Sequence, residues 1–144
     1  MFEKRLPLLM TFISLFHFKT VFDEFGNEYV LYESNPIHII PHITDHVQFE
    51  ASENHVHVLE HISRQEFASV DEFANDFMQL LLNSLLRCFP NKVFAVYLTV
   101  RLHDSMIIRF HQLWKDEPLF CNPDDFVFSK NEKVFMLRSD KVNR

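Results

Sequence analysis

The sequence predicts an α+β fold, in which a mostly antiparallel sheet of several hairpins carries one long helix on one face. Two observations indicate this class. Short segments rich in β-branched and aromatic residues recur along the chain between polar turns, and one segment, residues 70–89, has the apolar spacing of a helix. The chain has 144 residues and contains no repeat or Gly/Ser linker, so we expect a single domain over residues 1–144.

The sequence of the first third of the chain predicts strands, preceded by a short helix or a buried strand. Residues 6–18 form an apolar run, too short for a transmembrane helix of ~20 residues, and we expect a short N-terminal helix or a buried strand there. Residues 16–22 and 28–32 flank an Asp-Glu-Phe-Gly-Asn turn and predict a hairpin. Residues 46–51 and 55–62 are expected to pair as strands across a short polar turn.

The long helix is predicted over residues 70–89. Ser69 and Glu72 have the spacing of a capping box, in which each side chain accepts a hydrogen bond from a backbone N–H group at the helix start. Apolar residues follow at helical spacing with a polar stripe on the other side, and Pro90 ends the pattern.

The last third predicts two hairpins. Residues 93–100 are apolar on both alternating faces, as in a central strand, and residues 105–114 alternate apolar and polar side chains, as in a half-exposed partner strand. Residues 126–128 and 134–137 predict a second hairpin at the C-terminal end.

Composition argues against several kinds of chemistry. Gly26 is the only glycine, whereas phosphate-binding loops, dinucleotide fingerprints and nucleophile elbows need several. Cys88 and Cys121 do not form a Cys-x-x-Cys motif, so we expect free thiols and a cytoplasmic protein. Neither cysteine lies in a recognisable nucleophile motif, and the adjacent acids Asp124 and Asp125 are typical of a turn. We therefore expect no catalytic residue and no cofactor.

Charge is distributed unevenly along the chain. Residues 20–86 contain twelve acidic residues and a single basic one, Arg64, within a chain of net charge −6. Such a surface repels nucleic acid and anionic membranes and attracts a basic protein partner. The alternative is an acidic face that only confers solubility. Homo-oligomerisation is left open.

Six of the nine histidines lie in the acidic region. His57, Glu60 and His61 match the His-x-x-Glu-His string of inverted zinc peptidases, but that mechanism needs a helix and these residues favour a strand. A plainer metal site on one strand face would use His55, His57 and His61. Histidines on the solvent side of a half-buried strand explain the same pattern without a metal, so we expect no metal ligand.

The function that the sequence favours is a small, acidic, non-catalytic binding module of the inhibitor, immunity or regulatory type, engaging a basic partner. Its expected binding residues are Glu50, Glu53 and Glu60, because two flank the turn after residue 51 and the third lies on the strand that returns from it. Two alternatives remain: a metal-dependent enzyme that uses the central histidines, and a small-ligand pocket in the core, to which the 17 phenylalanines contribute.

Overall fold

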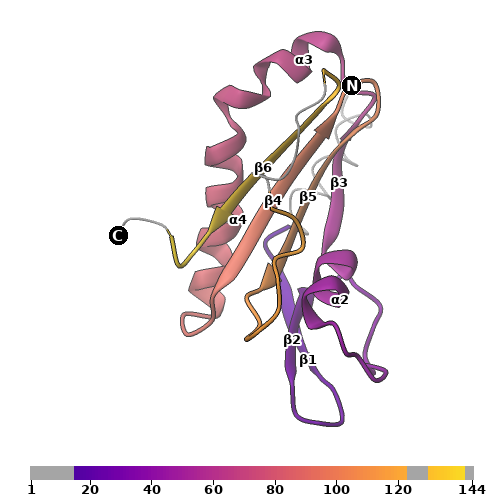
Figure 1. Ribbon diagram of the computed structural model, residues 1–144, viewed down its shortest axis with the longest axis vertical. Coiled ribbons are helices and arrows are strands. Elements are labelled where there is room, and N and C mark those ends of the chain that lie inside the picture. The colour runs from indigo at the N-terminus through magenta and orange to yellow at the C-terminus, as the bar shows by residue number, and fades with distance from the viewer. Residues whose placement is uncertain (1–14, 123–129, 142–144) are drawn as a thin grey trace.

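The computed structural model describes residues 15–122 and 130–141. Within these residues the fold is α+β, with two antiparallel sheets and three α-helices, as the sequence predicts (Figure 1). In chain order the elements are β1 (Phe18–Phe22), β2 (Glu28–Tyr32), α2 (His46–Glu53), β3 (His55–Glu60), α3 (Arg64–Ser69), the 3-10 helix η1 (Val70–Glu72), α4 (Ala74–Cys88), β4 (Phe94–Arg101), β5 (Ser105–Gln112) and β6 (Glu132–Arg138).

The larger sheet has the strand order β3-β5-β4-β6, and each neighbouring pair is antiparallel. β4 is central because it is apolar on both faces, with residues 94–98 all buried. The predicted strand at residues 93–100 and its hairpin with β5 are confirmed. The predicted C-terminal hairpin is only partly visible: its second arm is β6, which pairs with β4, and residues 126–128 lie outside the described residues.

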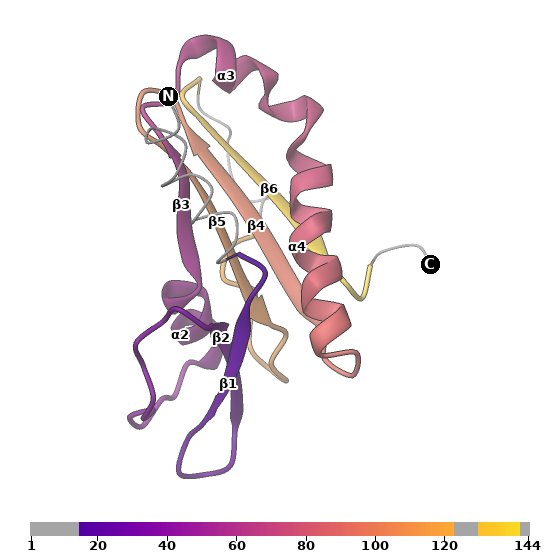
Figure 2. The same ribbon diagram turned by 180° about the vertical axis from the view of Figure 1, so that it is seen from behind.

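α4 packs on one face of the larger sheet, against β4 and β6 (Figure 2). α4 and β4 bury apolar side chains between them. The helix contributes residues at helical spacing, namely Ala74, Met78, Leu81, Leu82 and Leu85. The strand contributes every second residue, namely Phe94, Val96, Leu98 and Val100. The loop after β5, orange in Figure 1, crosses the opposite face, where Phe120 contacts Tyr97. The two faces of the sheet therefore have different covers.

The single long helix predicted over residues 70–89 is not confirmed. This part of the chain forms η1 and α4, of which α4 has 15 residues, and the separate short helix α3 precedes them. Ser69 is not a side-chain cap, since its hydroxyl donates to the Gln65 carbonyl at 2.9 Å. The capping box lies at Ser63 and Glu66, at the start of α3. The Ser-x-x-Glu spacing occurs at both places, so spacing alone did not distinguish them.

The strand predicted at residues 46–51 is wrong, because these residues form α2. Asp45 caps this helix by accepting a hydrogen bond from the Gln48 N–H group at 3.0 Å. Val47, Glu50 and Ala51 then bury one helical face. The expected second strand does form, as β3, but it pairs with β5.

The predicted hairpin at residues 16–22 and 28–32 is confirmed as the separate two-stranded sheet β1-β2. The N-terminal helix or strand expected within residues 6–18 falls largely on residues 1–14, outside the described residues. None of the helices in the described part of the chain combines the length and apolar character needed to cross a membrane.

Candidate functional site

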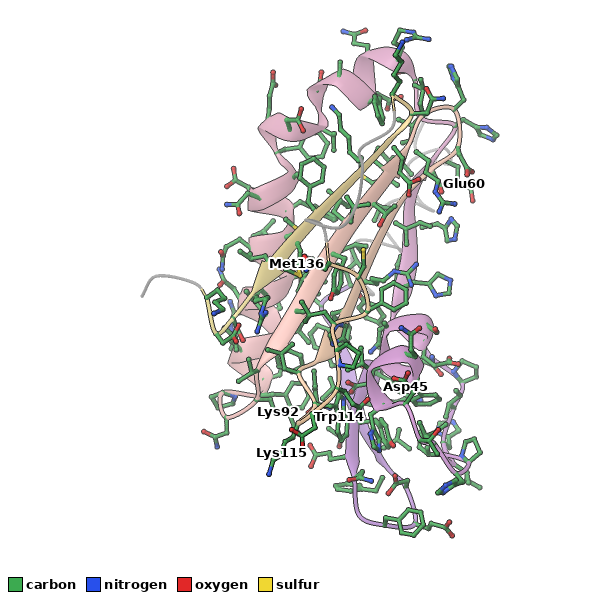
Figure 3. The ribbon with its side chains drawn as sticks, viewed as in Figure 1. Asp45, Glu60, Lys92, Trp114, Lys115 and Met136 are labelled. Carbon is green, nitrogen blue, oxygen red and sulfur yellow. The ribbon has the colours of Figure 1, made fainter. Side chains whose placement is uncertain are left out.

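The three carboxylates expected to form a binding face do not lie together. Glu50 is fully buried on α2, Glu53 is half-buried at the end of the same helix, and Glu60 is exposed at the far end of β3. The length of β3, roughly 3.3 Å per residue, separates Glu53 from Glu60. Figure 3 shows Glu60 near the opposite end of the molecule from Asp45, which begins α2. The expected grouping is therefore not met, and binding by Glu53 or Glu60 stays a prediction.

The Glu50 carboxylate is instead held inside the protein by hydrogen bonds. Its Oε1 accepts hydrogen bonds from the Gln112 N–H group at 2.9 Å and the Trp114 indole at 2.7 Å. Its Oε2 accepts from the Val30 N–H group at 2.9 Å and the Gln112 amide at 2.7 Å. Burial raises the pKa of Glu50, and the four donors oppose that rise. Since all four partners are donors, the site matches a carboxylate and has no acceptor for the proton of an acid.

The central histidines do not form a three-ligand site. His55 and His57 lie on the exposed side of β3 with ring centroids 5.8 Å apart. His61 follows the strand in a left-handed conformation, with φ of 58°. Among residues 15–122 and 130–141, no group of three or more His, Cys, Asp or Glu side chains is arranged to hold a metal ion. The peptidase string thus begins on a strand, where the helical geometry of that motif is missing.

The most exposed apolar side chains lie at the β1-β2 turn and in the loop that follows β2. Phe22 is 57% exposed, Phe25 is 65% exposed and Ile39 is 87% exposed. The Phe25 ring contacts the His42 ring edge-on at a centroid distance of 5.5 Å, which places the loop after β2 beside the turn. We call Phe22, Glu24, Phe25, Ile39 and His42 the hairpin-tip surface. Figure 1 shows this hairpin projecting beyond the larger sheet.

The turn that presents Phe25 is held by one carboxylate. Asp23 accepts hydrogen bonds from the N–H groups of Phe25 and Asn27, each at 2.9 Å, and from the Tyr29 hydroxyl at 3.0 Å. Burial acts to raise the pKa of Asp23, but these donors outweigh it and lower the pKa. Gly26 supplies the positive φ, 83°, that the turn requires. Phe25 is therefore carried on a fixed backbone.

Sequence reasoning located the acidic region but not this surface. The turn sequence identified the hairpin, and nothing in the local pattern distinguished an exposed Phe25 from the many buried aromatic residues. No protein-family model, no curated protein and no solved structure matches the chain.

Proposed function

We propose that the protein is a non-catalytic, cytoplasmic binding module that engages a basic protein partner through the hairpin-tip surface, as an inhibitor, immunity or regulatory protein does. The observation that carries the proposal is the exposure of Phe22 and Phe25 at the turn of the projecting β1-β2 hairpin, beside the loop after β2 that contains the exposed Ile39. Clustered exposed apolar side chains are typical of interaction sites, and aromatic anchors dominate binding energy at interfaces.

The backbone of the turn supports the same reading. Because Asp23 fixes the positions of Phe25 and Asn27, binding does not have to order the turn. A preorganised anchor loses less conformational entropy when a partner binds. An exposed aromatic side chain on a fixed turn is therefore suited to enter a pocket on a partner.

Charge supports a basic partner. Residues 20–63 contain eight acidic residues and no lysine or arginine, and Glu24 is exposed at the turn itself. Lys19, which precedes this segment, directs its ammonium group to the backbone carbonyls of Asn35 and Ile37. An acidic surface accelerates the encounter with a basic protein, and this effect weakens as salt screens the charges. Cys88 and Cys121, which are the two cysteines of the sequence, do not form a disulfide bond, which agrees with a reducing compartment.

The test uses a photo-cross-linking amino acid placed at position 25 of the full chain in its native cell. The matched control carries the same amino acid at Phe73, which is 40% exposed and follows two acidic residues but lies between η1 and α4, beside Leu59 and Met106 at the end of β3 and the start of β5. We expect position 25 to capture one protein at a surface rich in lysine or arginine, and position 73 not to capture it. Equal capture from both positions, or cross-links only to the chain itself, would contradict the proposal.

The captured partner is then used to measure association rates with purified protein. Phe25→Ala should weaken affinity about tenfold or more, as anchors do, and Glu24→Gln together with Asp45→Asn should slow association several-fold at low salt. Phe73→Ala is the control and should leave both quantities unchanged.

A further inference from the structure

A cavity of about 210 Å³ opens on the face of the larger sheet that α4 does not cover. Alternate residues of β4 point to this face, since their neighbours in the strand pack toward α4. The side chains that matter for its chemistry are Thr99 and Arg101 from β4, Ile107 and Arg109 from β5, Phe120 from the crossing loop, and Val134 from β6. Tyr97, Cys121 and Glu132 complete the lining, so the cavity combines two guanidinium groups and one carboxylate with apolar walls.

Arg109 has few partners in this cavity. Its guanidinium lies over the Phe120 ring, 4.5 Å from the centroid, and its Nη1 donates to the Ala51 carbonyl at 3.4 Å. Its Nε is buried and has no hydrogen-bond partner. No acidic side chain of residues 15–122 or 130–141 forms an ion pair with it. A buried donor without a partner destabilises the folded state, and a ligand that accepts its hydrogen bond removes that cost.

The neighbouring side chains do not supply the missing negative charge. Arg101 is itself a cation and already pairs with Glu132, whose Oε1 lies 3.3 Å from the Arg101 Nε. Tyr97 donates its hydroxyl to His111 Nε2 at 2.9 Å, because Nδ1 of that ring faces the Gln112 carbonyl at 2.6 Å and carries the hydrogen. Burial raises the pKa of Tyr97 to about 12, so its hydroxyl is neutral at physiological pH.

We propose that this cavity binds a small organic carboxylate, with the carboxylate group on Arg109 and an apolar body against Ile107, Phe120 and Val134. The Nη1 atom of Arg109 donates to the protein backbone and its Nε atom is covered by protein atoms, so a carboxylate pairs with the edge formed by Nε and Nη2 once the covering atoms shift. That edge matches the two oxygens of a carboxylate in geometry and charge. The cavity is smaller than the ~300–1,000 Å³ sites of drug-sized ligands, so the body is small. This proposal is independent of the hairpin-tip surface, which lies elsewhere.

The probe for the test is benzoate, added to the full-length protein labelled with ¹⁵N, and the readout is the arginine Nε–H signals. We expect benzoate to shift the Arg109 signal in a saturable way, and benzamide, its neutral counterpart, not to do so. Arg109→Lys, which keeps the charge and loses the two-pronged geometry, should weaken binding about tenfold. Arg87→Lys on the exposed end of α4 is the matched control and should bind as the wild type does.

A second variant keeps the test decisive if Arg109→Lys perturbs folding. Ile107→Phe narrows the cavity and leaves Arg109 in place, so it should abolish the benzoate shift. The proposal is overturned if benzoate has no effect on the wild type, if benzamide or inorganic phosphate shifts the Arg109 signal equally, or if Ile107→Phe binds normally. It also fails if benzoate binds only after Asp124→Asn and Asp125→Asn are introduced together, because the chain would then provide its own counter-ion.

Discussion

Glu50 and Arg109 are charged residues in neighbouring parts of the molecule, and their surroundings differ sharply. The Arg109 guanidinium contacts the carbonyl of Ala51, the residue directly after Glu50. Glu50 receives four hydrogen bonds at 2.7–2.9 Å, whereas Arg109 makes one long bond within the described residues and has a buried Nε without a partner. The buried carboxylate, with all its bonds made, fixes the fold, and the half-buried guanidinium, with a bond missing, is available to a ligand.

Burial acts on the pKa of both groups, in opposite directions because their charges differ in sign. It raises the pKa of Glu50, and it lowers the pKa of Arg109, to which Arg101 adds a smaller effect of the same sign. For Glu50 the hydrogen bonds offset part of the cost of burial, and the pKa stays raised. For Arg109 the positive charge of Arg101 adds to the cost of burial. Replacing Glu50 and Arg109 in turn tests this comparison.

The largest effect is expected for Glu50→Gln. The amide offers one oxygen and one NH2 group to four donors, so two buried donors lose their acceptors and unfolding free energy should fall by roughly 3 kcal/mol. Urea denaturation measures this change. Glu53→Gln, on the same helix but half-buried, should cost less than about 1 kcal/mol. Equal losses in the two variants would remove the structural role assigned to Glu50.

A smaller effect on the free energy of unfolding is expected for Arg109→Met, because Arg109 is not needed to hold the fold. Methionine fills a similar volume without a charge, so stability should stay within about 1 kcal/mol of the wild type or rise. The same urea experiment, without added carboxylate, measures it, and Arg101→Met serves as the comparison at a largely exposed ion pair. A loss above about 2 kcal/mol would show that Arg109 stabilises the fold through a partner of its own.

The smallest effect concerns His111, which shares β5 with Arg109 and is buried in its neutral form. Burial lowers the pKa of His111, so the unfolded chain takes up its proton at a higher pH than the folded chain. Its contribution to stability is complete above the unfolded pKa of ~6.5 and declines as the pH falls below that value.

His111→Gln keeps an acceptor for Tyr97 and removes the titration. The stability difference between pH 7.5 and pH 5.5 should therefore be smaller in this variant than in the wild type, as measured by urea denaturation at both pH values. His57→Gln, at an exposed position, should retain the wild-type dependence. Unchanged pH dependence in His111→Gln would contradict the assignment of a neutral, buried imidazole.

Sequence patterns predicted the strands better than the helices. All six of the described strands overlap segments that alternation or apolar runs indicate, because the period of two is visible within a few residues. α2 was missed because its residues 46–53 have weak helical amphipathicity, and its start depends on the Asp45 cap. The break between η1 and α4 is likewise a tertiary effect, since the apolar spacing runs through it without interruption.

The candidate sites could be predicted only in part. The alternation in β5 placed Arg109 and His111 on its polar side, but whether that side faces solvent, a loop or a ligand depends on Phe120, which is 11 residues further along the chain than Arg109. Glu50 could not be distinguished from the other acidic residues of its region, because its four hydrogen-bond donors come from elements that are distant in the sequence. The charged residues of a sequence therefore indicate the sign of a surface, but they do not show which of those residues are exposed on it.

Glu50 and Asn54 also determine how the two sheets are joined. Asn54 Oδ1 accepts from the Tyr32 N–H group at 3.2 Å, its Nδ2 donates to the Val30 carbonyl at 2.8 Å, and its own carbonyl accepts from the Phe110 N–H group at 3.2 Å. Together the two residues occupy the space between β2 and β5 where a further strand would otherwise pair. The folding of the small hairpin is thereby coupled to that of the large sheet, and the amide protons of Val30, Tyr32, Phe110 and Gln112 should exchange with solvent as one cooperative unit.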